Sequence, residues 1–222
     1  IVVTIQYRLG VLGWFSSSAL DEEEAIRSGG ASGNQALKDV IGALKWVRAY
    51  IEDFGGDNSR VTVFGQSFGA AMMQLLLYSP LAAGTFDRMI IESAGWDTTQ
   101  NALSTSATAQ GQMYSAVTSA LSCTGGNATA QLACMRASSW QNVLDLTGAD
   151  RVNISQAMAV IDAGSSTNPL FVSPALTMQP IDAIKSGAFN QVPIIIGHNE
   201  KESRLGDYFA ETTFADASAK YG

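Results

Sequence analysis

Ser67 stands in the run Gly65-Gln66-Ser67-Phe68-Gly69, between a short strand expected at residues 61–64 and an apolar helix expected at 68–78. A serine on such a strand-to-helix turn has the layout of a nucleophile elbow, which exposes the hydroxyl at the carboxyl end of a sheet. The turn strains the backbone, so we expect both flanking positions to require glycine. The hydroxyl also lies at a helix N-terminus, where free N–H groups favour developing negative charge.

The G-x-S-x-G pattern alone is weak evidence, because the chain contains 21 glycines and is rich in serine. The alternative interpretation is an ordinary buried Gly-Ser turn in a doubly wound sheet. The β-branched residues before Ser67 and the apolar helix expected after it favour a nucleophile over that alternative.

Strands and helices alternate along the chain. Apolar residues at helical spacing predict a helix over 34–54, for which Ser32 and Gln35 fit a capping box. Further strands are expected at 1–5, 88–92 and 193–197, the last one buried, and a short helix at 181–186. This alternation predicts an α/β fold with a mostly parallel sheet and helices on both faces. Polar segments at 66–68, 93–96 and 198–203 should then meet at the carboxyl edge of the sheet.

Composition narrows the classes of function. A formal charge of −7 and a pI near 4.6 argue against nucleic acid or an anionic membrane surface as a partner. No apolar run approaches the roughly 20 residues of a transmembrane helix. One histidine and scattered acids give no ligand spacing for a metal. We expect residues 1–222 to form a single α/β domain fragment, cut at both ends from a longer protein.

Two weak signs favour an oxidising compartment. Cys123 and Cys134 lie 11 positions apart, a spacing that suits a local disulfide, although two free thiols are the alternative. Asn127 and Asn153 begin sequons for N-glycosylation, which also arise by chance. Together these features predict a secreted protein.

The chain resembles the type B carboxylesterases, which include the cholinesterases and the fungal carboxylester lipases. The resemblance covers most of the chain and is carried by the runs Tyr7-Arg8-Leu9-Gly10, Gly33-Asn34-Gln35-Ala36-Leu37-Lys38-Asp39, Phe54-Gly55-Gly56-Asp57, Val61 to Ala70, and Val192-Pro193 to Glu202. It implies an α/β-hydrolase fold and a secreted serine esterase or lipase. Such an enzyme acts on small-molecule or lipid esters through an acyl-enzyme and needs no cofactor.

The resemblance also implies a Ser–Glu–His triad in that chain order. Ser67 takes the nucleophile position and Glu202 the acid position, with Glu200 as the rival. The triad histidine and the glycine-rich oxyanion loop of the family lie outside this sequence. His198, the only histidine, matches a non-catalytic position.

Further roles follow from the same resemblance. The N–H of Phe68 would serve the oxyanion hole, although the family usually has alanine there and the ring should narrow or reshape the pocket. Gln66, where the family often has glutamate, and Ser93 would lie next to the reacting groups. Arg8 and Asp39 would form a buried salt bridge, and the family's short-loop disulfide matches Cys123 and Cys134.

Some relatives of this family are binding or adhesion proteins on an inactive hydrolase scaffold, which is the alternative function. The presence of both Ser67 and Glu202 argues against it.

Overall fold

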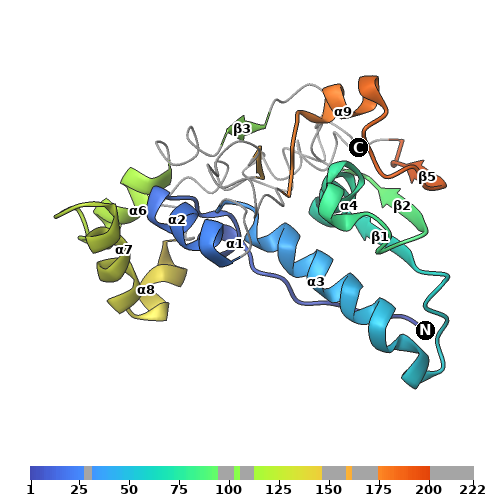
Figure 1. Ribbon diagram of the computed structural model, residues 1–222, viewed down its shortest axis with the longest axis horizontal. Helices are drawn as coiled ribbons and strands as arrows, with labels where there is room; N and C mark the ends of the chain where they lie inside the picture. The colour runs from blue at the N-terminus through green and yellow to red at the C-terminus, as the bar shows by residue number, and fades with distance from the viewer. Residues whose placement is uncertain (28–31, 95–102, 106–112, 147–158, 162–174, 201–222) are drawn as a thin grey trace, which may run out of the picture.

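The computed structural model describes residues 1–27, 32–94, 103–105, 113–146, 159–161 and 175–200 (Figure 1). Its α-helices are α1 (Gly10–Trp14), α2 (Ser18–Arg27), α3 (Gln35–Tyr50), α4 (Phe68–Tyr78), α6 (Ser115–Ala120), α7 (Ala128–Ala137), α8 (Trp140–Asp145) and α9 (Pro180–Ser186), with 3-10 turns η1 (Ile51–Phe54) and η2 (Pro80–Ala82). Its strands are β1 (Thr62–Gln66), β2 (Arg88–Glu92), β3 (Ser104–Thr105), β4 (Val160–Ile161) and β5 (Ile194–Gly197). No helix in these ranges is long and apolar enough to cross a membrane.

The helix predicted over 34–54 is confirmed as α3 followed by η1, which ends at Gly55 with φ +80°. Its apolar stripe is buried, as the periodicity predicts. The capping box is wrong, because Asn34 occupies the N-cap and Ser32 instead donates to Asp21 Oδ1 at 2.6 Å. The Ser32 hydroxyl therefore bonds to α2 from the segment that enters α3, and it does not cap the helix.

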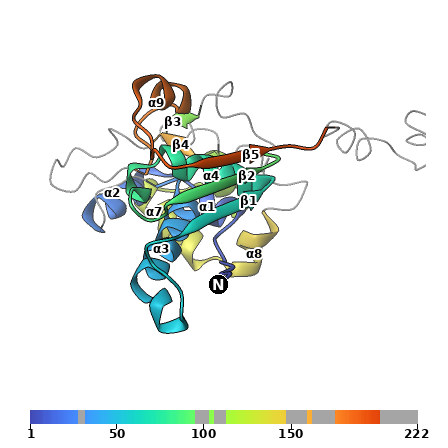
Figure 2. The ribbon, with the colours of Figure 1, turned by 90° about the vertical axis from the view of Figure 1, so that its right-hand side faces the viewer.

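The central sheet has the strand order β1-β2-β5, and both pairs are parallel. Helix α4 connects β1 to β2 and covers one face, where Val63, Met89 and Ile91 are buried (Figure 2). A second, two-stranded sheet pairs β3 with β4, also in parallel. The predicted α/β class with a parallel sheet is therefore confirmed.

The opposite face of the central sheet is exposed within the described residues. Phe64, Ile90 and Ile195 form one row across the three strands, and Phe64 and Ile195 are 57% and 67% exposed. The prediction that β5 is buried is thus wrong for the described part of the chain. There β5 has β2 as its one paired neighbour and lies at the sheet edge.

The expected strand at residues 1–5 is also not formed. A strand needs a hydrogen-bonded neighbour, and a groove of about 860 Å³ separates this segment from β1. Val40, Leu44 and Val47 of α3 also line the groove. Ile1 and Val2 remain 73% and 76% exposed, whereas Ile5 is partly buried against the core.

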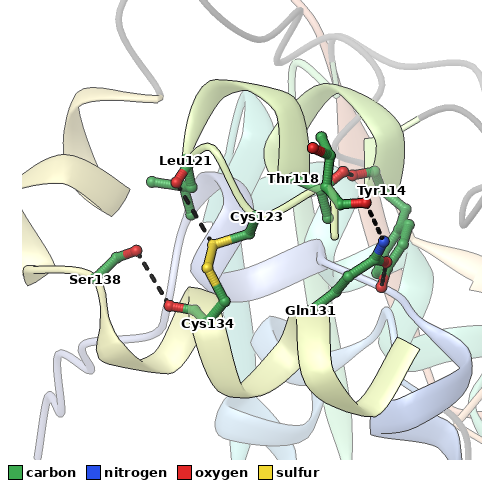
Figure 3. The surroundings of a disulfide bond; sticks show 8 residues. Tyr114, Thr118, Leu121, Cys123, Gln131, Cys134 and Ser138 are labelled. Carbon is green, nitrogen blue, oxygen red and sulfur yellow. Dashed lines mark hydrogen bonds between the residues drawn. A yellow bond between two sulfur atoms is a disulfide. The ribbon is translucent and has the colours of Figure 1, made fainter. Parts of the chain in front are cut away.

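Helices α6, α7 and α8 form a separate group at the far end of α1 and α2 (Figure 1). Cys123 and Cys134 form the predicted disulfide, with a Cα–Cα distance of 5.7 Å, which excludes the alternative of free thiols (Figure 3). Arg136 of α7 forms a bidentate ion pair with Glu23 of α2, in which Nη1 and Nη2 donate to Oε1 and Oε2 at 2.6 and 2.7 Å. The disulfide-bonded group is therefore tied to the segment that precedes α3.

Candidate active site

Ser67 occupies the N-cap of α4, directly after β1, with φ 56° and ψ −120°. A positive φ is strained for any residue other than glycine and persists only where the surroundings impose it. Here the N–H of Ser67 donates to the carbonyl of Glu92 at 3.0 Å, which extends the β1–β2 ladder by one bond. Ser67 itself is exposed, so its hydroxyl is presented to solvent on a strained strand-to-helix turn.

The two glycines beside Ser67 differ in what they require. A Cβ at Gly65 would overlap the carbonyl oxygen of Gly69 and lie 3.0 Å from the backbone nitrogen of Ala70, so this position needs glycine. A Cβ at Gly69 would meet no atom within 4 Å, and Gly69 has no positive φ. The prediction that both flanks require glycine is right for Gly65 and wrong for Gly69, because the tight approach places the backbone of 69 over 65.

The three parallel strands end together, since Gln66 is in register with Glu92, and Glu92 with Gly197. The N–H of Ser93 donates to the carbonyl of Gly197 at 2.8 Å, and Ser93 also has a positive φ of 50°. The described parts of the predicted polar segments therefore do meet at the carboxyl edge, where Ser93 lies between Ser67 and the turn after β5. With strands about 4.8 Å apart, that turn begins roughly 10 Å from Ser67.

The candidate acids follow β5. Glu202 lies outside the described residues, so its role as the triad acid stays a prediction. Glu200 lies in the turn and is exposed. His198 is exposed as well, and its Nδ1 lies 2.9 Å from the carbonyl oxygen of Asn199. It directly follows β5, which is separated from β1 by β2.

Phe68 is the first residue of α4, and first-turn N–H groups have no acceptor within their own helix. The N–H of Phe68 is one of these groups, and its role in the oxyanion hole stays a prediction. Phe68 is 40% exposed, and its ring packs edge-to-face with that of Trp14 of α1. Gln66, the last residue of β1, is exposed beside the nucleophile.

The profile of the carboxylesterase family matches residues 1–220. The chain belongs to the carboxylesterase family. It is 35% identical over 204 residues to the fumonisin B1 esterase of Sphingopyxis macrogoltabida, with 92% of this chain and 34% of that protein covered. It is 33% identical to the juvenile hormone esterase of Tribolium castaneum over 92% of this chain and 34% of that protein.

A solved structure of a PNB esterase matches with a TM-score of 0.62 and 29% identity over 90% of this chain and 38% of that one. The fold is therefore the predicted α/β-hydrolase fold, of which this chain comprises a part. The chain spans about a third of the length of the curated carboxylesterases it matches.

Among the features expected of a carboxylesterase, the Arg8–Asp39 pair is present but not buried. The guanidinium donates through Nε and Nη2 to the carboxylate at 2.8 and 2.7 Å, and the N–H of Arg8 adds a bond of 3.0 Å. The side chains of Arg8 and Asp39 are 51% and 24% exposed. Burial acts to raise the pKa of Asp39, but the hydrogen bonds and charge of Arg8 outweigh it and hold the pKa below its usual value.

The remaining expected residues are only partly described. Asn127 is exposed at the N-cap of α7, where its side-chain oxygen accepts from the N–H of Ala130 at 2.9 Å. This cap does not use the amide nitrogen to which a glycan attaches. Asn153 lies outside the described residues. In the described ranges no three His, Cys, Asp or Glu side chains gather as a metal site requires.

Sequence reasoning missed Trp14. The residue reads as one more apolar position in the run after Arg8, and nothing in its spacing links it to Ser67. Its ring reaches the residue that follows Ser67 because α1 and α4 both pack on α3.

Proposed function

We propose that the full-length protein hydrolyses carboxylic esters through an acyl-enzyme formed on Ser67. The observation that carries this proposal is the strained backbone of Ser67, an exposed residue at the carboxyl edge of a parallel sheet. Strain of this kind is retained where it serves a function. Membership of the carboxylesterase family supports the reaction class.

In the proposed reaction Ser67 Oγ attacks the ester carbonyl while a histidine outside these 222 residues takes the hydroxyl proton. The resulting oxyanion accepts a hydrogen bond from the N–H of Phe68, the kind of donor that contributes a few kcal/mol to catalysis. Collapse of the intermediate breaks the ester C–O bond, and the histidine protonates the departing alcohol. Water then attacks the acyl-enzyme and releases the acid, without a cofactor.

We assign the triad acid to Glu202, with Glu200 as the alternative. Both follow β5, which is separated from β1 by one strand. The two strand spacings leave roughly 10 Å between the nucleophile and the start of this turn, room for an imidazole to bridge serine and carboxylate. Ser93, in the turn after the intervening strand, borders this space.

The proposed substrates are small-molecule or lipid esters, and the proposed location is extracellular. The relatives are named as esterases of fumonisin B1 and juvenile hormone, which are statements about those proteins. The Cys123–Cys134 disulfide supports an oxidising compartment. The exposed Asn127 supports glycosylation in that compartment.

The test is turnover of p-nitrophenyl acetate by the full-length protein and three variants. We expect Ser67→Ala and Glu202→Gln each to lower kcat at least about 10³-fold. Glu200→Gln is the matched control and should stay within about threefold of wild type. Equal losses for the two glutamate variants would contradict the assignment of the acid. A wild-type protein without turnover would favour the binding or adhesion alternative.

A further inference from the structure

The contact between Phe68 and Trp14 is not explained by the proposed chemistry. The two ring centroids lie 6.2 Å apart with their planes at 81°, the edge-to-face arrangement that aromatic pairs favour. The two residues come from α4 and α1, which are separated by α2, α3 and β1 in the chain. The contact therefore connects the residue after Ser67 with a distant part of the fold.

Trp14 is a rigid partner in this contact. It is only 2% exposed. The preceding residue, Gly13, is packed so closely that a Cβ there would lie 2.5 Å from the carbonyl oxygen of Arg8 and 3.1 Å from the Cβ of Ala36. The hydrogen bonds from Arg8 to Asp39 fasten the entry to α1 onto α3 as well. The position of the indole is thus fixed from both ends of α1.

Phe68 lies between this fixed ring and the nucleophile. On its other side the backbone of Ser67 is held by the hydrogen bond to Glu92. Phe68 is 40% exposed, so part of this residue stays open to solvent directly after Ser67 in the chain. Loss of the contact would free this ring and would release the first turn of α4, which carries the Phe68 N–H, from its attachment to α1.

We propose that Trp14 is a positioning residue that locks Phe68, and that this pair restricts the enzyme to esters with short, narrow acyl groups. The inference rests on the proposed function of Ser67 and adds a substrate class to it. Trp14 acts through Phe68 and does not touch the substrate. Phe68 supplies both the oxyanion donor and a wall of the acyl site.

The test is a double-mutant cycle in the full-length protein, with kcat and KM measured for p-nitrophenyl acetate and p-nitrophenyl octanoate. We expect Trp14→Leu to lower kcat for acetate about tenfold with little change in KM, because the oxyanion donor loses its alignment. The octanoate-to-acetate ratio of kcat/KM should rise about tenfold, because the freed ring opens the acyl site. Phe68→Leu should shift this ratio equally, and the double variant should shift it no further.

Trp14→Phe keeps an aromatic partner and should stay close to wild type in both readouts. Trp46→Leu, which removes an exposed tryptophan from α3, is the matched control and should change neither. Additive shifts in Trp14→Leu and Phe68→Leu would overturn the inference. If Trp14→Leu does not fold, Phe68→Leu is a sufficient test. An unchanged octanoate-to-acetate ratio of kcat/KM in Phe68→Leu would then overturn the inference.

The two proposals fail differently in this experiment. If the wild-type protein turns over p-nitrophenyl acetate but the effects of the two substitutions are additive, only the inferred coupling of Trp14 and Phe68 is refuted. Wild-type protein without turnover or covalent labelling removes the function and the inference with it.

Discussion

At the scale of residues, two backbone hydrogen bonds hold the turn at Ser67 in a strained conformation. Ser67 holds φ 56° because its N–H is bonded to β2 while its carbonyl accepts the N–H of Ala71 in the first turn of α4. One bond continues the sheet and the other begins the helix, so the backbone changes direction within this single residue. Gly65 makes this possible, since only a hydrogen atom fits beneath the backbone of Gly69.

The glycine pair gives a matched prediction at this scale. Gly65→Ala should lower the free energy of unfolding by about 2–4 kcal/mol, because the new methyl group overlaps backbone that cannot move without opening the turn. Gly69→Ala should raise stability by up to about 1 kcal/mol, since alanine is favoured over glycine in a helix and the space is open. Urea unfolding of both variants measures this. Equal destabilisation by the two substitutions would contradict the geometry of the turn.

At the scale of elements, periodic and strongly apolar segments were predictable from sequence. The 3.6-residue spacing of α3, the apolar run of α4 and the β-branched residues of β1 all predict the observed elements. The elbow followed from Gly65 and Ser67 between two such elements. The strand expected at 1–5 was wrong because an apolar pattern does not supply a hydrogen-bonded neighbour.

What the sequence could not predict depends on contacts between distant segments. The pairing of Trp14 with Phe68 arises because α1 and α4 both pack on α3, and no local pattern encodes it. The exposure of β5 likewise depends on which segments cover the sheet, not on its own apolar residues. The motif around Ser67 could be predicted from the sequence. Which residues are buried, and which distant side chains contact one another, required the structure.

The Arg8–Asp39 pair connects the segment before α1 to α3 and gives a pH-dependent prediction. Since the pKa of Asp39 is lowered in the folded protein, its contribution to stability is present above the unfolded pKa of about 3.9. That contribution is lost as pH falls through the folded pKa. Asp39→Asn should cost about 1 kcal/mol at pH 7, a value reduced by the exposure of Arg8.

Urea unfolding of wild type and Asp39→Asn from pH 7 to pH 3 measures this effect. The difference between the two proteins should shrink below about pH 4, where Asp39 of the unfolded chain takes up a proton, and vanish as pH falls through the lowered pKa of the folded state. Lys45→Gln, at an exposed position of α3, changes the charge by one unit and is the control. A difference that stayed constant down to pH 3 would contradict the role of the carboxylate charge.

At the scale of the whole molecule, the described residues hold the proposed nucleophile and the strand that precedes the proposed acid. The central sheet has an exposed face with Phe64 and Ile195, and β1 borders the groove lined by α3. The disulfide-bonded group of α6 to α8 is anchored on α2 at the other end. The proposed catalytic base is a histidine outside these residues, so we expect the proposed activity of the full-length protein.

The most direct measurement is peptide mapping of the full-length protein after reaction with a fluorophosphonate, which modifies serines activated as nucleophiles. The account predicts a single adduct on the peptide that contains Ser67, its absence in Ser67→Ala, and loss of esterase turnover in proportion to the labelling. An adduct on a different serine, or turnover that survives complete modification of Ser67, would contradict the claim that this turn presents the nucleophile.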